Sequence, residues 1–179
     1  MLRRYILTGA PGAGKTTTAR RLAAAGHTVI AEAATDLITA SQAAGIDAPW
    51  DDPALTDEIA ALQRERQHRA DALPGPVQFF DRSPVCTLAM ARFTGHEPGP
   101  VLLAELDRIT TERIYQTTVL LFDLLDAITP TNVRRVTLDE ARAFERVHLD
   151  AYAEYGFRIE RLPPLPIAAR AALAERLAS

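Results

Sequence analysis

Short apolar runs alternate along the chain with longer segments whose apolar residues recur at helical spacing. The short runs are typical of strands, and the run at 118–123 is apolar throughout, as expected for a strand buried on both faces. The alternation predicts an α/β fold of three layers, in which helices cover both faces of a parallel sheet. We expect strands at 5–8, 28–31, 77–81, 118–123 and 157–162, and helices at 15–25, 33–44, 52–73, 83–93, 101–115, 137–155 and 167–177.

Residues at the predicted helix ends support these boundaries. Gly26 follows the first helical segment, where a helix commonly ends. Asp52 and Pro53 are typical of a helix cap and first turn. Thr137 and Glu140 have the spacing of a capping box, in which each residue binds the backbone of the other. The sequence thus marks several helices independently of their apolar pattern.

Composition narrows the class of protein. A length of 179 residues suits one domain, residues 1–179, with a sizeable core. The net charge of −3 gives no electrostatic reason to expect nucleic acid. No apolar run has the length of a membrane span, and Cys86, the single cysteine, excludes an internal disulfide. We therefore expect a cytoplasmic protein without a nucleic-acid or membrane partner; composition leaves the oligomeric state open.

The chain contains one lysine, Lys15, against nineteen arginines. That lysine lies in the sequence Gly-Ala-Pro-Gly-Ala-Gly-Lys-Thr at residues 9–16, which matches the phosphate-binding pattern G-x-x-x-x-G-K-[ST]. Because arginine replaces lysine elsewhere, a lysine kept here indicates a need for a compact ammonium group. The expected strand before the loop and the expected helix after it agree with this interpretation.

Each part of this loop has an expected role toward ATP. The glycines let successive N–H groups converge on phosphate oxygens, and Lys15 would lie between the β- and γ-phosphates. The Thr16 hydroxyl would bind Mg²⁺. The residues expected to bind the nucleotide are Gly9, Ala10, Pro11, Gly12, Ala13, Gly14, Lys15, Thr16 and Thr17.

Three residues at predicted strand ends are further candidates for chemistry. Asp81 can hold Mg²⁺ beside the loop, or it can cap the helix that follows. Arg82 can bind a phosphate or the acceptor, or it can pair with a neighbouring carboxylate. Glu32 can accept the proton of a substrate hydroxyl, or it can be a surface or capping glutamate. The sequence alone leaves these alternatives open.

Two longer segments have expected functions. Residues about 124–142 form a candidate lid, in which Arg134, Arg135 or Arg142 would neutralise transferred phosphate; the alternative is a solvated loop. Residues about 34–73 form a candidate helical insert on the acceptor side, with Trp50 as a stacking group. The four histidines are dispersed and show no zinc-type spacing, and His148 carries no specific hypothesis.

Taken together, these residues resemble P-loop kinase-like NTPases of the small AAA-domain family that includes the ribosylnicotinamide kinase domain. The resemblance rests on the loop at 9–16, Glu32, the segment 80–83, the arginines after the fourth strand, the junction at 155–157 and the segment 163–170. It implies sheet order 2-3-1-4-5, ATP with Mg²⁺, and phosphoryl transfer to a small molecule. Members often have arginine three residues after the glutamate, where this chain has Thr35, so no acceptor is carried over.

Two functions of different classes follow. The first is an ATP- and Mg²⁺-dependent kinase that phosphorylates a hydroxyl of a small molecule, either a nucleoside-like metabolite or an antibiotic, as in the similar chloramphenicol phosphotransferases. The second is a regulatory or switch-type ATPase that acts through a protein partner. A guanine-reading N-K-x-D motif is excluded because no second lysine exists, and the length argues against an AAA+ motor or an ABC or RecA-type core.

Overall fold

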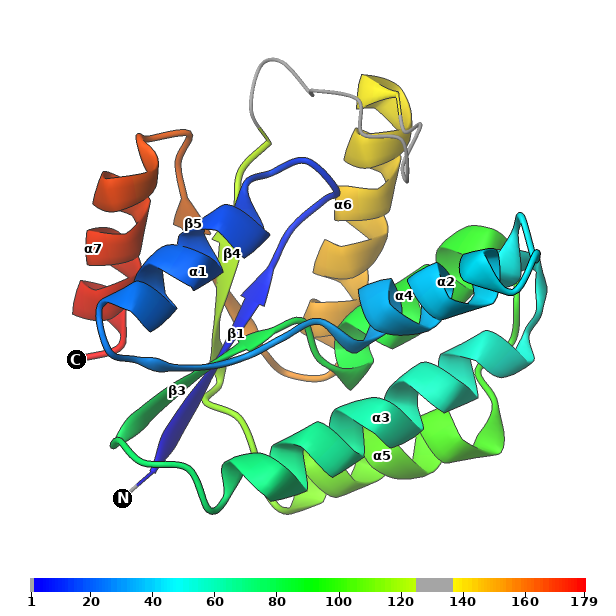
Figure 1. Ribbon diagram of the computed structural model, residues 1–179, viewed down its shortest axis with the longest axis horizontal. Coiled ribbons are helices and arrows are strands. Elements are labelled where there is room, and N and C mark those ends of the chain that lie inside the picture. The colour runs from blue at the N-terminus through cyan, green and yellow to red at the C-terminus, as the bar shows by residue number, and fades with distance from the viewer. Residues whose placement is uncertain (1, 125–136) are drawn as a thin grey trace.

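The computed structural model describes residues 2–124 and 137–179. Within these ranges, five strands form one parallel sheet in the order β2-β3-β1-β4-β5 (Figure 1). The predicted sheet and its order are therefore confirmed. The strands are β1 (Arg3–Thr8), β2 (Thr28–Ile30), β3 (Val77–Asp81), β4 (Thr118–Phe122) and β5 (Arg158–Leu162).

Helices cover both faces of this sheet, as the alternating pattern predicts (Figure 1). One face carries α1 (Lys15–Ala24) and α7 (Ile167–Leu177), which pack against each other. The opposite face carries α3 (Ala54–Ala70), α4 (Pro84–Thr94), α5 (Pro100–Thr111) and α6 (Leu138–Glu154). A shorter helix, α2 (Ala33–Ala43), packs on α3 and is followed by a 3₁₀ turn, η1 (Pro49–Asp51).

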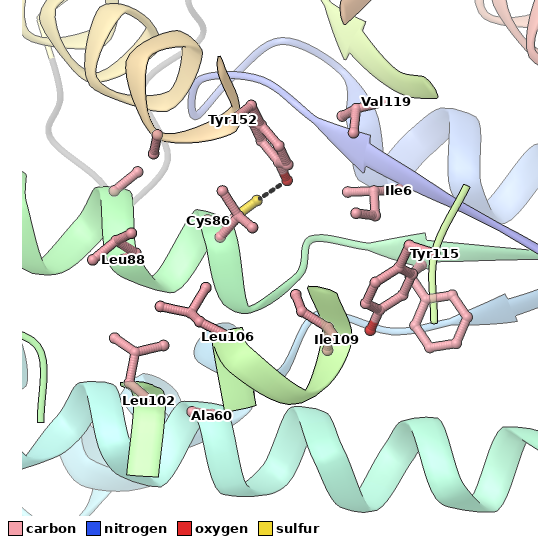
Figure 2. Packing of buried hydrophobic residues seen from close by; sticks show 14 of the residues in the cluster. Ile6, Ala60, Cys86, Leu88, Leu102, Leu106, Ile109, Tyr115, Val119 and Tyr152 are labelled. Atoms are coloured by element: carbon pink, nitrogen blue, oxygen red, sulfur yellow. Dashed lines mark hydrogen bonds between the residues drawn. The ribbon is translucent and has the colours of Figure 1, made fainter. Parts of the chain in front are cut away.

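Alternation along the central strands supplies both halves of the core. Successive residues of a strand point to opposite faces. Leu7 and Phe79 therefore join the cluster against α1 and α7, whereas Ile6 and Phe80 join the cluster against α3, α4, α5 and α6. Figure 2 shows part of the second cluster. Because both faces are covered, these strands are apolar on both sides, which explains their continuous apolar runs.

Two helices, α5 and α3, end three or four residues before the sequence-based expectation. The helix expected to reach residue 115 ends at Thr111, because Arg113 adopts the left-handed conformation (φ 51°) and the Ile114 N–H bonds the Ile109 carbonyl (3.1 Å). The helix expected at 52–73 begins at Ala54, whose N–H donates to the Asp52 carboxylate (2.9 Å), and ends at Ala70.

The strand register places three chain segments at one edge of the sheet. Leu7 of β1 lies opposite Asp81 of β3, and Ile30 of β2 lies opposite Phe80. The loop after β1, Glu32 after β2 and the end of β3 therefore meet at the carboxyl edge, where ligands bind in sheets of this type. No helix in residues 2–124 and 137–179 has the length and apolar character that crossing a membrane requires.

Candidate active site

The loop at 9–16 turns tightly between β1 and α1. Gly9 has φ 135°, and a Cβ at this position would lie 2.6 Å from the Phe122 carbonyl oxygen at the end of β4. Gly14, with φ 81°, adopts a left-handed conformation immediately before α1. Glycine is required at position 9 because the Phe122 carbonyl lies too close for a Cβ, and it is favoured at position 14 because of the left-handed backbone conformation. The N-terminus of α1 consequently opens onto the loop, an arrangement that favours an anionic ligand.

Lys15 is the first residue of α1, and its side chain is enclosed by the loop. It is 5% exposed, and its Nζ donates to the carbonyl oxygens of Gly9 (2.9 Å) and Ala10 (3.1 Å). A tetrahedral ammonium can serve two convergent acceptors in so small a space, whereas a planar guanidinium is wider. The enclosure supplies a physical reason for the single lysine of the chain.

Thr16 and Asp81, the two predicted metal ligands, lie side by side. Thr16 Oγ1 donates to Asp81 Oδ2 (3.3 Å). Asp81 is 5% exposed, and its Oδ1 has no hydrogen-bond partner among the residues that the structure describes. Burial raises the pKa of Asp81, and the nearby charge of Lys15 opposes this effect. A buried carboxylate with one unpartnered oxygen fits a divalent cation.

This pair could supply only part of a metal coordination sphere. Within the described part of the chain, no group of three or more histidine, cysteine, aspartate or glutamate side chains could hold a metal ion. Mg²⁺ in nucleotide sites characteristically takes one or two protein ligands and completes its shell with phosphate oxygens and water. Thr16 and Asp81 fit that type of site. The structure gives Asp81 no role in capping α4, whose N-cap residue is Ser83.

Glu32 and Arg82 form an ion pair at the same edge of the sheet. Glu32 Oε1 contacts Arg82 Nε, and both side chains are largely buried. Burial, the largest single effect, lowers the pKa of Arg82, but Glu32, Cys86 and Asp81 together outweigh it and raise the pKa. Glu32 also raises the pKa of Asp81, so the two carboxylates lie within electrostatic reach of each other. The Glu32 side chain makes no capping hydrogen bond at the start of α2.

The backbone of Arg82 is held in an uncommon conformation. Its φ is 75°, in the left-handed region that favours glycine, while its N–H donates to the Leu7 carbonyl (3.0 Å). Such a conformation in a non-glycine residue costs about 1–3 kcal/mol and occurs preferentially at functional sites. The strain turns the chain at the end of β3, immediately before α4.

A narrow cavity lies between this edge and α3. Gln63, Phe80, Asp81, Arg82 and Tyr115 are among its lining residues. Its lining combines aromatic and polar side chains, but its volume of about 10 Å³ admits little more than one water molecule, so in this structure it lacks room for a small organic molecule.

Side chains of α3 contribute to this cavity in ways that the sequence reasoning did not anticipate. Gln63 accepts a hydrogen bond from Thr87 Oγ1 (3.0 Å), and Arg66 donates to the Ala31 carbonyl (2.9 Å) and pairs with Asp36. The sequence held one signal for this contribution: Gln63, a polar residue, lies among the buried positions of α3. Trp50, expected to stack on the acceptor, is not among the residues lining the cavity; its carbonyl contacts His96 (3.2 Å).

Arg170 of α7 binds the phosphate loop at Ala13. Its guanidinium donates to three backbone carbonyls: Ala13 in the loop, Asp123 after β4 (3.0 Å) and Pro163 after β5 (2.7 Å). It also lies over the Phe122 ring, 5.6 Å from the centroid, and is 2% exposed. The sequence reasoning assigned this residue no role beyond its place in the segment 163–170, because its three partners are distant along the chain.

Most of the candidate lid cannot be compared with its prediction. Arg134 and Arg135 lie outside the described residues, as do the other residues at 125–136. Arg142, the third candidate, lies on α6, is exposed and pairs with Asp139 at 3.6 Å. The predicted capping box at the start of α6 is present, since Thr137 and Glu140 bind each other's backbone N–H groups.

Comparisons with known proteins agree with this architecture. A family model described as AAA domain matches residues 4–170. A search of curated proteins gives no match. Among solved structures, the chain is similar to a deoxyadenosine kinase from M. mycoides with the products dCMP and a flexible dCDP bound, with a TM-score of 0.57 and 11% identity over 97% of each chain. It is also similar to deoxyadenosine kinase from M. mycoides with bound dATP (TM-score 0.51, 13% identity, 98% of this chain and 100% of that chain).

Identities at this level show a shared fold and leave substrates unassigned. The family model, in contrast, spans nearly the whole chain, including the phosphate loop, both strand-end acids and Arg170. The chain belongs to this AAA-domain family and is a P-loop kinase-like NTPase.

Proposed function

We propose that this protein is an ATP- and Mg²⁺-dependent kinase that phosphorylates a hydroxyl of a small, nucleoside-like molecule. The observation that carries the proposal is the pair of carboxylates beside the phosphate loop. Asp81 adjoins Thr16, whereas Glu32 faces Arg82 next to the cavity against α3. A kinase needs one acid for the metal and a second for the acceptor hydroxyl. The similarity to deoxyadenosine kinases favours a nucleoside-like acceptor.

Each residue of the site would have a separate role in the proposed phosphoryl transfer. Lys15 and the loop N–H groups bind the triphosphate, and Thr16 and Asp81 hold Mg²⁺, which supplies positive charge to the phosphate oxygens. Glu32 accepts the proton of the acceptor hydroxyl as that oxygen bonds to the γ-phosphorus and the bond to the β-phosphate oxygen breaks. Arg82 pairs with Glu32 and orients it. The products are ADP and the phosphorylated acceptor.

ADP release from Mg²⁺–ATP tests this proposal directly. The purified protein is assayed alone and with ribonucleosides, deoxyribonucleosides, sugars and antibiotics, and the phosphorylated acceptor is identified by mass. A nucleoside should raise ADP release above the intrinsic rate, and Lys15→Ala should abolish the increase. Glu32→Gln should lower acceptor-dependent kcat about 100-fold, the lower end of the effect of a general base.

Glu58→Gln is the matched control for Glu32→Gln, since Glu58 is an exposed glutamate of α3. It should leave ADP release unchanged. If no acceptor raises ADP release above the intrinsic rate, the kinase proposal fails and the regulatory ATPase becomes the better hypothesis. If Glu32→Gln is as active as Glu58→Gln, Glu32 is not the base.

A further inference from the structure

A buried polar network lies behind Arg82, between α4 and α6. Tyr152 Oη is 2.9 Å from Ser83 Oγ and 3.0 Å from Cys86 Sγ, and Cys86 Sγ is 3.3 Å from Thr8 Oγ1. Figure 2 shows Tyr152 of α6 pointing toward Cys86 of α4. The network ends at Thr8, the residue before the phosphate loop. Polar groups this deeply buried are costly unless they bind one another, so a fully connected network holds its members in defined positions.

His148 of α6 interacts with Cys86 of this network and contacts Arg82. It is 0% exposed. Its Nδ1 lies 2.9 Å from the Phe144 carbonyl oxygen, and its Nε2 lies 3.3 Å from Arg82 Nη1. A carbonyl oxygen only accepts and a guanidinium only donates. Both contacts are therefore hydrogen bonds only when the imidazole is neutral, with its proton on Nδ1 and a lone pair on Nε2.

Arg82 is thus held from two sides. Its Nε contacts Glu32, its Nη1 donates to His148, and its guanidinium lies 6.0 Å from the centroid of the Phe144 ring. The last two contacts both come from α6. They act on a residue whose backbone is already strained at φ 75°. Because the guanidinium is planar and rigid, a contact that holds Nη1 also restricts the position of Nε. Nε is the nitrogen that contacts Glu32.

We propose that His148 is a positioning residue for the phosphoryl transfer: as a neutral Nδ1–H imidazole, it holds the Arg82 guanidinium so that Arg82 orients Glu32 toward the acceptor hydroxyl. The inference rests on the proposed kinase function, and it adds a residue on α6 that contacts neither ATP nor the acceptor. Loss of the Nε2 acceptor leaves the buried Arg82 Nη1 without this partner and lets the guanidinium turn away from Glu32.

Kinetics of two His148 variants test this role. Glutamine can place an oxygen acceptor near the position of Nε2, whereas leucine fills the volume without one. His148→Leu should lower acceptor-dependent kcat about ten-fold, as loss of an orienting partner does elsewhere, with the KM for ATP changed less than about two-fold. His148→Gln should recover most of the activity. His68→Leu, at an exposed histidine of α3, is the control for the chemical change.

A purely structural His148 would give a different pattern. Both variants would then lower the melting temperature, and the kcat of His148→Gln would fall as far as that of His148→Leu. That result would overturn the positioning role. Equal and undiminished kcat in His148→Leu would overturn it as well, while the kinase proposal would stand.

A spectroscopic measurement tests the contact without any substrate. Nitrogen-15 NMR of labelled histidine distinguishes protonated from unprotonated ring nitrogens, and His148→Gln assigns the signal. His148 should carry its proton on Nδ1 alone, and Arg82→Met should relax this preference. A proton on Nε2, or on both nitrogens, would overturn the inference. If the expected tautomer is found but no acceptor turns over, the kinase proposal fails while the contact between His148 and Arg82 stands.

Discussion

Arg170→Met tests whether α7 holds the phosphate loop in shape. The guanidinium of Arg170 joins the loop at Ala13 to the chain after β4 and after β5 through three carbonyl oxygens. Methionine keeps much of the side-chain volume but has no donor. The substitution therefore removes the hydrogen bonds while disturbing the packing on Phe122 and Gly14 as little as the chain allows.

The expected loss of stability follows from two opposing effects. Hydrogen bonds from a charged group contribute about 1.5–3 kcal/mol each. Against this, burial lowers the pKa of Arg170, which shows that its charge is desolvated, and desolvation of a buried ion costs several kcal/mol. We expect a net loss of about 3 kcal/mol in the free energy of unfolding, by weighing these two contributions. In a domain of this size that corresponds to a fall of about 6–12 °C in Tm.

Nucleotide affinity should fall as well. Ala13 lies between two glycines of the loop, so its carbonyl is held in place by few other constraints. Without Arg170, the loop samples conformations that no longer direct its N–H groups at phosphate. We expect Mg²⁺–ATP to bind about ten-fold more weakly, a change of about 1.4 kcal/mol. Thermal unfolding and calorimetric titration with a non-hydrolysable ATP analogue measure the two effects separately.

The control is Arg176→Met, at an exposed arginine of the same helix. Its effect on unfolding should stay within about 0.5 kcal/mol, as for most surface substitutions. If Arg170→Met loses no more stability than Arg176→Met, the three hydrogen bonds do not anchor the fold. If Arg170→Met loses stability but binds the analogue like the wild type, the loop keeps its shape without Arg170.

Three further substitutions probe the phosphate loop and Asp81, the proposed Mg²⁺ ligand. Lys15→Arg should weaken ATP-analogue binding at least about ten-fold although the charge is kept, because the enclosed site suits an ammonium; calorimetry with wild-type affinity would refute this. Asp81→Asn should raise the Tm of the metal-free protein at neutral pH and remove the Mg²⁺ dependence of nucleotide binding. Burial raises the pKa of Asp81 in the folded protein, so ionised Asp81 destabilises the fold. This loss of stability is absent below the pKa of Asp81 in the unfolded chain and grows as the pH rises through its pKa in the folded protein. A lower Tm for Asp81→Asn than for the wild type would contradict this reasoning. Gly9→Ala should destabilise more than Gly26→Ala in urea unfolding, since both have positive φ but only the first places a Cβ 2.6 Å from the Phe122 carbonyl; equal losses would show that the contact is harmless.

The sequence predicted the features that depend on local patterns. The apolar runs located the central strands, because strands buried on both faces are mainly apolar. The loop pattern and the acid at the end of β3 placed Thr16 and Asp81 at one edge, and the two side chains are hydrogen-bonded there. Glu32 and Arg82 could be assigned to that edge, although their ion pair was only one of the alternatives.

Features formed by contacts between distant segments could not be predicted in this way. Arg170 reaches Ala13 across 157 positions of the chain, and His148 reaches Arg82 across 66. His148 belongs to no motif that would mark it, and Arg170 was marked only by its place in the segment 163–170. The early end of α5 depends on the left-handed conformation of Arg113, a residue type that rarely adopts it. In each case the position of the residue or the end of the helix depends on tertiary contacts or backbone strain, which the local sequence does not indicate.

The charges at the carboxyl edge also bear on how a nucleotide would bind. Lys15 and Arg82 are positive, Asp81 and Glu32 are negative, and these four buried or largely buried groups balance one another. A triphosphate adds several negative charges to a site that has no net positive charge of its own from these groups. A cation that entered with the triphosphate would offset these charges, and Asp81 Oδ1, which has no hydrogen-bond partner among the described residues, would offer it a ligand. We therefore expect Mg²⁺ to strengthen ATP binding. Added salt should weaken ATP binding by less than Mg²⁺ strengthens it, because buried charges are screened little by salt.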